Sequence, residues 1–137
     1  MPVNPLTTLR RSIVAASLSL LAALSQAAPL PAPARAEVDA LLSALQASGC
    51  EFNRNGSWYP ASEAKVHLLK KLDYLEGKDA VRTADQFIEL GASTSSVSGK
   101  PYLVRCGKAE PVESRAWLGA RLAALRSASR PAASAPK

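Results

Sequence analysis

Apolar residues recur at helical spacing in four segments of the chain, and each segment is bounded by helix-start or helix-stop residues. One example is Val38, Leu41, Leu42 and Leu45, which would form a single stripe on a helix that ends at Gly49. The expected helices cover residues 37–48, 63–76, 83–90 and 115–126.

Hydroxyl residues precede three of these segments and are expected to cap the helices. Ser62 and Ser114 stand directly before the second and fourth helices. Thr83 and Gln86 have the spacing of a capping box, in which the hydroxyl and the amide each satisfy an unpaired backbone donor. The pattern predicts well-defined N-termini for all three helices.

Two short segments are rich in strand-forming residues. Residues 50–54 lead into Asn55-Gly56, a turn signal because both residues tolerate positive φ, and residues 101–106 end at Gly107. Pairing of the two segments would bring Cys50 and Cys106 close together. The prediction is a single small α+β domain, mostly helical, with about four short helices and a two-stranded antiparallel sheet.

The ends of the chain differ in composition from its middle. Arg10-Arg11 precedes an apolar run at 13–24 and a small-residue cleavage site, so residues 1–27 are predicted to be a signal peptide. This run is shorter than the roughly 20 residues needed to span a bilayer, so no membrane span is expected after signal removal. Residues 28–36 and 127–137 are rich in proline and alanine and are predicted to be a disordered linker and tail. The folded domain would then cover residues 37–126 of an exported protein.

The two cysteines have two interpretations. In an exported protein an even pair suggests a disulfide, and Cys50 and Cys106 would close a loop of about 56 residues. The alternative is two buried thiols that act as small hydrophobic side chains.

Charge patterning excludes some functional classes. The formal net charge is +6, and it would fall to +4 on removal of Arg10 and Arg11. The charges alternate in sign, and the longest basic run in the domain is Lys70-Lys71, which is interpreted as a solvated helix face, with an anion site as the alternative. No nucleic-acid partner is therefore expected. One histidine and two distant cysteines lack the ligand spacing of a metal site, so no metal or cofactor is predicted.

The single histidine raises the question of catalysis. His67 lies four residues after Glu63, so the two side chains are in reach of a hydrogen bond on one helix face. A serine from residues 93–98 would complete a Ser-His-Glu hydrolase, which is a third functional hypothesis beside the two given below. No G-x-S-x-G motif surrounds any serine, and serine clusters are common in loops for turn-forming reasons. We therefore expect no enzymatic activity.

A set of motifs across about 50 residues resembles the YfeK-like family of small exported bacterial proteins of unknown function. The matching positions are Arg54-Asn55-Gly56, Glu63-Ala64, His67-Leu68, Phe87-Ile88, Ser95-Ser96 and Gly99-Lys100-Pro101-Tyr102. The resemblance implies that these positions belong to one recurring unit, and it implies no activity.

The leading hypothesis is a non-enzymatic binding or accessory module of the cell envelope, whose partner is an envelope protein or a cell-wall ligand. The candidate binding residues are Arg54, Asn55, His67, Ser95, Ser96, Ser98, Lys100 and Tyr102. The alternative is an inhibitor of an envelope enzyme such as a lysozyme-type glycosidase. Ser98-Gly99-Lys100-Pro101-Tyr102 resembles the Ser-Gly-x-x-Tyr loop of membrane-lysozyme inhibitors, although those are β-barrels and this chain is predicted to be mostly helical.

Overall fold

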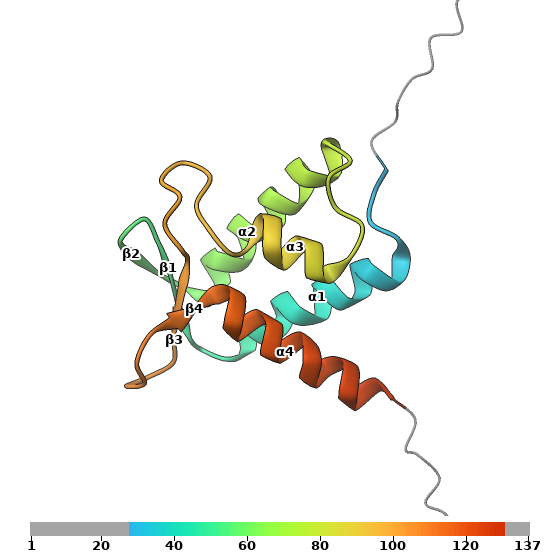
Figure 1. The fold of residues 1–137 in the computed structure, drawn as a ribbon. Coiled ribbons are helices and arrows are strands. Elements are labelled where there is room, and N and C mark those ends of the chain that lie inside the picture. The colour runs from blue at the N-terminus through green and yellow to red at the C-terminus, as the bar shows by residue number, and fades with distance from the viewer. Residues whose placement is uncertain (1–27, 131–137) are drawn as a thin grey trace, which may run out of the picture.

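A computed structural model of the chain describes residues 28–130. The predicted signal peptide and the last seven residues of the predicted tail lie outside this range. The elements in chain order are α1 (Ala32–Ala47), β1 (Glu51–Arg54), β2 (Ser57–Pro60), α2 (Ala61–Gly77), α3 (Ala84–Gly91), β3 (Leu103–Arg105), β4 (Val112–Glu113) and α4 (Ser114–Ser129). Four helices pack against one another, and the sheet lies at one end of them (Figure 1). The α+β, mostly helical class is as predicted. No helix within residues 28–130 is long and apolar enough to cross a membrane.

The sheet has four strands in the order β2-β1-β3-β4, all antiparallel, so the prediction of two strands was wrong. The predicted pairing of β1 with β3 is confirmed. β2 forms a hairpin with β1 through Asn55 and Gly56, whose φ angles of 52° and 85° are those that the Asn-Gly turn signal anticipates. β2 was missed because it ends in Pro60 and is too short for an alternating pattern, and β4 has only two residues.

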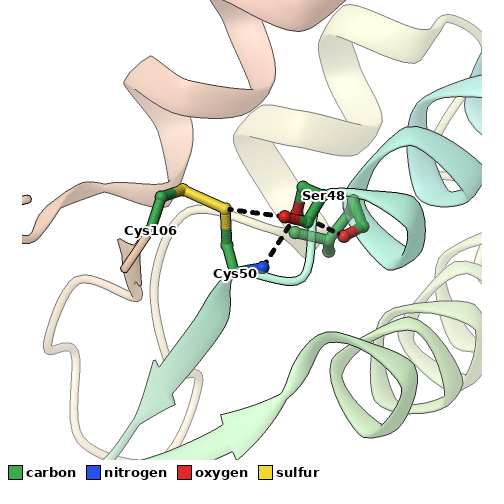
Figure 2. The surroundings of a disulfide bond; sticks show 4 residues. Ser48, Cys50 and Cys106 are labelled. Carbon is green, nitrogen blue, oxygen red and sulfur yellow. Dashed lines mark hydrogen bonds between the residues drawn. A yellow bond between two sulfur atoms is a disulfide. The ribbon is translucent and has the colours of Figure 1, made fainter. Parts of the chain in front are cut away.

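The disulfide between Cys50 and Cys106 is present, with the two Cα atoms 4.3 Å apart (Figure 2). It crosses the end of the β1–β3 pair, directly before β1 and directly after β3. In the register of this pair Glu51 faces Arg105 and Phe52 faces Val104, and the cysteines continue the same register by one step. If β1 slipped by one residue against β3, every side chain of β1 would move to the other face of the sheet. By fixing this register, the disulfide fixes which side chains face the helices and which face outward.

The two faces of the sheet have different environments. Phe52 and Val104 point toward the helices and are buried, as the period-two alternation of a strand requires. On the outer face Glu51 and Arg105 form an ion pair, and the Arg105 guanidinium lies 4.0 Å from the centre of the Trp58 ring. The helices therefore cover one face, and the other face carries a charged and aromatic surface.

The helix caps were predicted correctly in one case of three. The Thr83 hydroxyl accepts a hydrogen bond from the Gln86 backbone at 3.1 Å, whereas the Gln86 side chain accepts from the backbone of Arg82. Ser62 and Ser114 do not cap, because α2 and α4 start earlier than expected, directly after Pro60 and Glu113. Ser114 is fully buried, and its hydroxyl has no hydrogen-bond partner within residues 28–130.

The segment 28–36 is not a disordered linker as predicted, because α1 begins at Ala32. Proline is tolerated in the first helical turn, where backbone N–H groups have no intrahelical acceptor, and alanine has the highest helix propensity. Leu30 is buried, and its backbone N–H donates to the Glu76 carboxylate at 2.9 Å. Arg35 donates to the same carboxylate at 3.3 Å. These contacts with the end of α2 hold the segment, and a composition argument cannot detect them. At the other end, α4 runs to Ser129, three residues into the predicted tail.

One arginine joins three helices. Arg126 of α4 donates to Glu37 of α1 at 2.6 Å and to Asp85 of α3 at 2.7 Å. These hydrogen bonds lower the pKa of both carboxyl groups below their ordinary values. The pair of bonds supports the packing of α1, α3 and α4 at the end of the molecule away from the sheet.

We expect replacement of both cysteines by alanine (C50A/C106A) to lower the free energy of unfolding by about 4 kcal/mol, because the unfolded chain regains the entropy of a loop of about 56 residues. Urea unfolding of the variant and of the unreduced protein measures the difference. The reduced wild-type protein serves as the control and should match the variant. A loss under about 1 kcal/mol would show that the helices alone hold the β1–β3 register.

Candidate functional site

The position of Arg54 follows from strand geometry. Arg54 is two residues beyond Phe52 on β1, so its side chain leaves the same face of the sheet, at the edge of the core. Its guanidinium lies 5.2 Å from the centre of the Tyr59 ring, which belongs to the neighbouring strand β2. The aromatic ring holds the charged group against the protein without neutralising it.

Arg54 donates a hydrogen bond to His67 of α2, with 2.7 Å between Nη1 and Nδ1. A guanidinium has donors only, so Nδ1 of His67 must be unprotonated. Burial, together with the nearby charges of Arg54, Lys71 and Lys70, lowers the pKa of His67 from 6.5 to about 4. The imidazole is therefore neutral at pH 7, and its single proton is on Nε2.

The Tyr102 hydroxyl is the next group in this network. Extension of the β1–β3 register by one step places Tyr102 opposite Arg54. His67 Nε2 lies 3.3 Å from the hydroxyl and donates to it, and the Lys71 ammonium donates to it at 3.2 Å. Both lone pairs of the hydroxyl are then occupied. Its own proton has no acceptor among the described residues.

These side chains surround a cavity of about 280 Å³ that is open to solvent. Its lining residues come from the β1–β2 hairpin, from α2 and from the loop at 94–101 together with Tyr102, which follows the loop. They are Arg54, Asn55, His67, Lys70, Lys71, Tyr74, Ser95, Ser96, Val97 and Tyr102. Three of them carry a positive charge, and no lining residue is a carboxylate.

Most of the sequence-predicted site residues therefore lie together. Arg54, Asn55, His67, Ser95, Ser96 and Tyr102 all line the cavity. Ser98 and Lys100 do not. Ser98 instead donates a hydrogen bond to Asn55 at 2.6 Å, and Lys100 is exposed outside the lining.

Lys70, Lys71 and Tyr74 also line the cavity and were not among the predicted site residues, because the lysine pair was interpreted as a solvated helix face. Together with His67 they occupy positions i, i+3, i+4 and i+7 of α2, which form one polar stripe beside the buried leucines. This helical spacing could have identified the three residues from the sequence, because it places them on the same face of α2 as His67. Lys71 also donates to the carbonyl of Thr94 at 3.2 Å and so joins α2 to the loop.

The serine-rich loop at 94–101 is held by its own hydrogen bonds. The Ser95 hydroxyl accepts from the backbone of Val97 and Ser98, at 3.2 and 3.3 Å. The Ser95 backbone donates to the carbonyl of Lys100 and accepts from Gly99, where φ is +71°. The bond between Ser98 and Asn55 ties the loop to the β1–β2 hairpin. Ser95 and Ser98 thus serve the shape of the loop, whereas the exposed Ser96 faces the cavity.

The geometry does not assemble the Ser-His-Glu arrangement. Within residues 28–130 His67 hydrogen-bonds to Arg54 and Tyr102, and to neither Glu63 nor a serine. Glu63 lines a separate cavity of about 70 Å³, whose lining also includes Arg54 and His67. In the same part of the chain, no group of three His, Cys, Asp or Glu residues is arranged to hold a metal ion.

We expect the free energy of unfolding to fall as the pH decreases from 6.5 toward 4. The unfolded chain protonates His67 near pH 6.5 and the folded chain only near pH 4, so the stability that the neutral ring contributes is complete above pH 6.5 and is lost below it. The loss should be on the order of 1 kcal/mol between pH 7 and 5, because the partly exposed ring is screened by water.

Urea unfolding at pH 7, 6 and 5 tests this, with His67→Gln as the comparison. His67 is the only histidine of the chain, so the variant should show a flat profile. Above pH 5 the carboxylates of Glu37 and Asp85, whose pKa values are lowered, remain ionised. Equal slopes in the two proteins would contradict the assignment.

Comparison with known proteins gives a relative and a family, both without an assigned function. The chain is 40% identical over 93 residues to the uncharacterized protein YfeK of Salmonella typhimurium, an alignment that covers 67% of this chain and 76% of the relative. No solved structure matches the chain. A family model described as a family of unknown function (DUF5329) matches residues 32–126, which include every strand and nearly all of the helices described above. The chain therefore belongs to the DUF5329 family of unknown function, and it is YfeK-like, as its motifs predicted.

Proposed function

We propose that the protein is a non-enzymatic binding or accessory module of the cell envelope, and that its ligand site is the cavity between β1, α2 and the loop at 94–101. The observation that carries this proposal is the convergence of side chains from three separate segments on one open cavity. Arg54, Lys71 and Tyr102 are already oriented there by protein contacts, so a ligand meets donors in fixed positions.

The hydrogen bonding of His67 supports binding rather than hydrolysis. A general base must contact the hydroxyl that it deprotonates, but the unprotonated nitrogen of His67 is occupied by Arg54. A pKa of about 4 also makes the ring a weak base at neutral pH. The most buried loop serine, Ser95, uses its oxygen to accept two backbone hydrogen bonds.

The proposed location is the periplasm or the exterior of a Gram-negative cell. The disulfide between Cys50 and Cys106 supports it, because such bonds form and persist in oxidising compartments. The basic and apolar pattern of residues 10–27 supports it independently. In that setting we propose a cell-wall ligand or an envelope protein as the partner.

Titration of the isotope-labelled protein with soluble disaccharide-peptide fragments of the cell wall tests the proposal by NMR. We expect saturable shifts in the backbone signals of Lys71, Ser96 and Tyr102. Arg54→Ala should weaken binding by about tenfold or more, the value of one charge-assisted hydrogen bond. Arg105→Ala is the matched control, because Arg105 is also on a central strand but faces the opposite side of the sheet.

Equal weakening by the two substitutions, or shifts confined to the Trp58 and Arg105 face, would contradict the site. If the wall fragments do not bind, a photoreactive amino acid at position 96 should crosslink an envelope protein in living cells, and the same label at position 108 should not. Failure of both experiments would overturn the proposed function.

A second candidate is inhibition of a lysozyme-type glycosidase, and one observation favours it. The loop at 94–101 projects beside the β1–β2 hairpin (Figure 1), and Val97 at its tip is 90% exposed although the loop is held by internal hydrogen bonds. A rigid projecting loop with an exposed apolar tip is suited to enter a cleft, because little conformational entropy is lost on binding.

If the protein is such an inhibitor, excess protein should slow the hydrolysis of cell-wall suspensions by lysozyme. The Val97→Asp variant should lose most of the inhibition, because a carboxylate at the tip would meet the catalytic carboxylates of the cleft. Val66→Asp is the matched control, since Val66 is another exposed valine outside the loop. An unchanged rate of hydrolysis at excess protein would remove this candidate.

A further inference from the structure

The cavity is lined by three cations and by no carboxylate. Elsewhere in residues 28–130 five arginines form ion pairs with carboxylates, namely Arg35, Arg82, Arg105, Arg115 and Arg126, whereas six other cations form none, namely Lys65, Lys78, Lys100, Lys108, Arg121 and Arg130. Arg54, Lys70 and Lys71 form none. Three like charges in one cavity repel one another, and the resulting positive potential favours a bound anion.

The neutral groups of the cavity favour an anion as well. His67 is neutral and gives its Nε2 proton to Tyr102, so the ring adds no charge to the cavity. The Tyr102 hydroxyl accepts from both His67 and Lys71, so its own proton has no acceptor among the described residues. Tyr102 is only 2% exposed, and a ligand can meet this proton only where the buried side chain borders the cavity. The remaining donors are therefore the Tyr102 hydroxyl, the other N–H groups of Arg54, the Lys70 ammonium, and the one N–H of Lys71 that bonds neither Thr94 nor Tyr102.

These donors approach from different directions. Arg54 comes from β1, the lysines come from adjacent positions on α2, and Tyr102 comes from the position directly before β3. A carboxylate is planar, has two oxygens and carries one charge, so it suits a single bidentate arginine. In this cavity one terminal nitrogen of Arg54 is already bonded to His67. A tetrahedral dianion offers oxygens in several directions and balances more of the positive charge.

We propose that the cavity binds a phosphate group, in particular the phosphate monoester of a larger molecule. This inference rests on the binding function proposed above and specifies the ligand class of the same site. Tyr74 and Val97 complete the lining, and their side chains are 64% and 90% exposed. They provide a ring face and an apolar surface for the body of the ligand, such as a sugar ring, while the phosphate meets the cationic donors.

The test is an NMR titration of the purified protein at pH 7.5 and constant ionic strength with inorganic phosphate, glucose 6-phosphate, acetate and glucose. We expect both phosphates to shift the signals of Lys71 and Tyr102 and to saturate, with acetate and glucose at least tenfold weaker. Tighter binding of glucose 6-phosphate than of inorganic phosphate would identify a monoester as the ligand. Equal affinities would identify free phosphate instead, which overturns the monoester part of the proposal.

The double variant Lys70→Gln/Lys71→Gln should lose about tenfold or more in phosphate affinity, since charge-assisted contacts are removed and the size of the side chains is kept. Lys65→Gln/Lys108→Gln is the matched control, because both lysines lie outside the cavity lining. Thermal unfolding of the two variants separates a loss of the site from a loss of the fold, and we expect both to melt within a few degrees of the wild type.

Absence of shifts with 20 mM phosphate would overturn the phosphate assignment. The phosphate assignment would also be overturned if cell-wall fragments that contain no phosphate bound the wild type and the Lys70→Gln/Lys71→Gln variant equally well. In that second case the proposed binding function stands and only its ligand class fails, so the two proposals are tested separately.

Discussion

The antiparallel register of β1 with β3 is the constraint on which the rest of the structure depends. It is held at one end by the disulfide and leads at the other end to Arg54 and Tyr102. Between these ends, Phe52 and Val104 join the sheet to the helices. A shift by one residue would put Arg54 on the outer face and Glu51 in the core. The disulfide and the polar network of Arg54 and Tyr102 thus lie at opposite ends of the same strand pair.

The polar network has a definite direction of hydrogen bonding. Arg54 donates to His67, His67 donates to Tyr102, and Lys71 donates to the same hydroxyl. Every fixed charge in this network is positive, and the only titratable member within the neutral pH range is kept neutral by burial and by those charges. The protein contacts therefore orient the cationic groups without neutralising them, in contrast to Arg126, whose charge is balanced by Glu37 and Asp85.

Local patterns were sufficient to predict much of this fold. Leucine spacing identified the helices, Asn55-Gly56 identified the hairpin turn, and the cysteine positions were compatible with the strand pairing that the structure contains. The failures depended on contacts between segments distant in sequence. The first turn of α1 is held by Glu76 of α2, and β2 and β4 exist because a neighbouring strand supplies their hydrogen bonds. For the cavity, motif resemblance predicted most of the lining residues. Lys70 and Lys71 were not predicted, because the sequence does not show that their face of α2 lies beside the loop at 94–101.

The internal hydrogen bonding of the loop at 94–101 has a practical consequence for labelling. The bonds use backbone groups and the hydroxyls of Ser95 and Ser98, so none of them requires the side chain at position 97. That side chain is at the rim of the cavity and almost entirely in water. A fluorescent amino acid at position 97 would leave the loop geometry intact. Binding of a ligand in the cavity would then be detected as quenching of its fluorescence or as a shift of its emission wavelength.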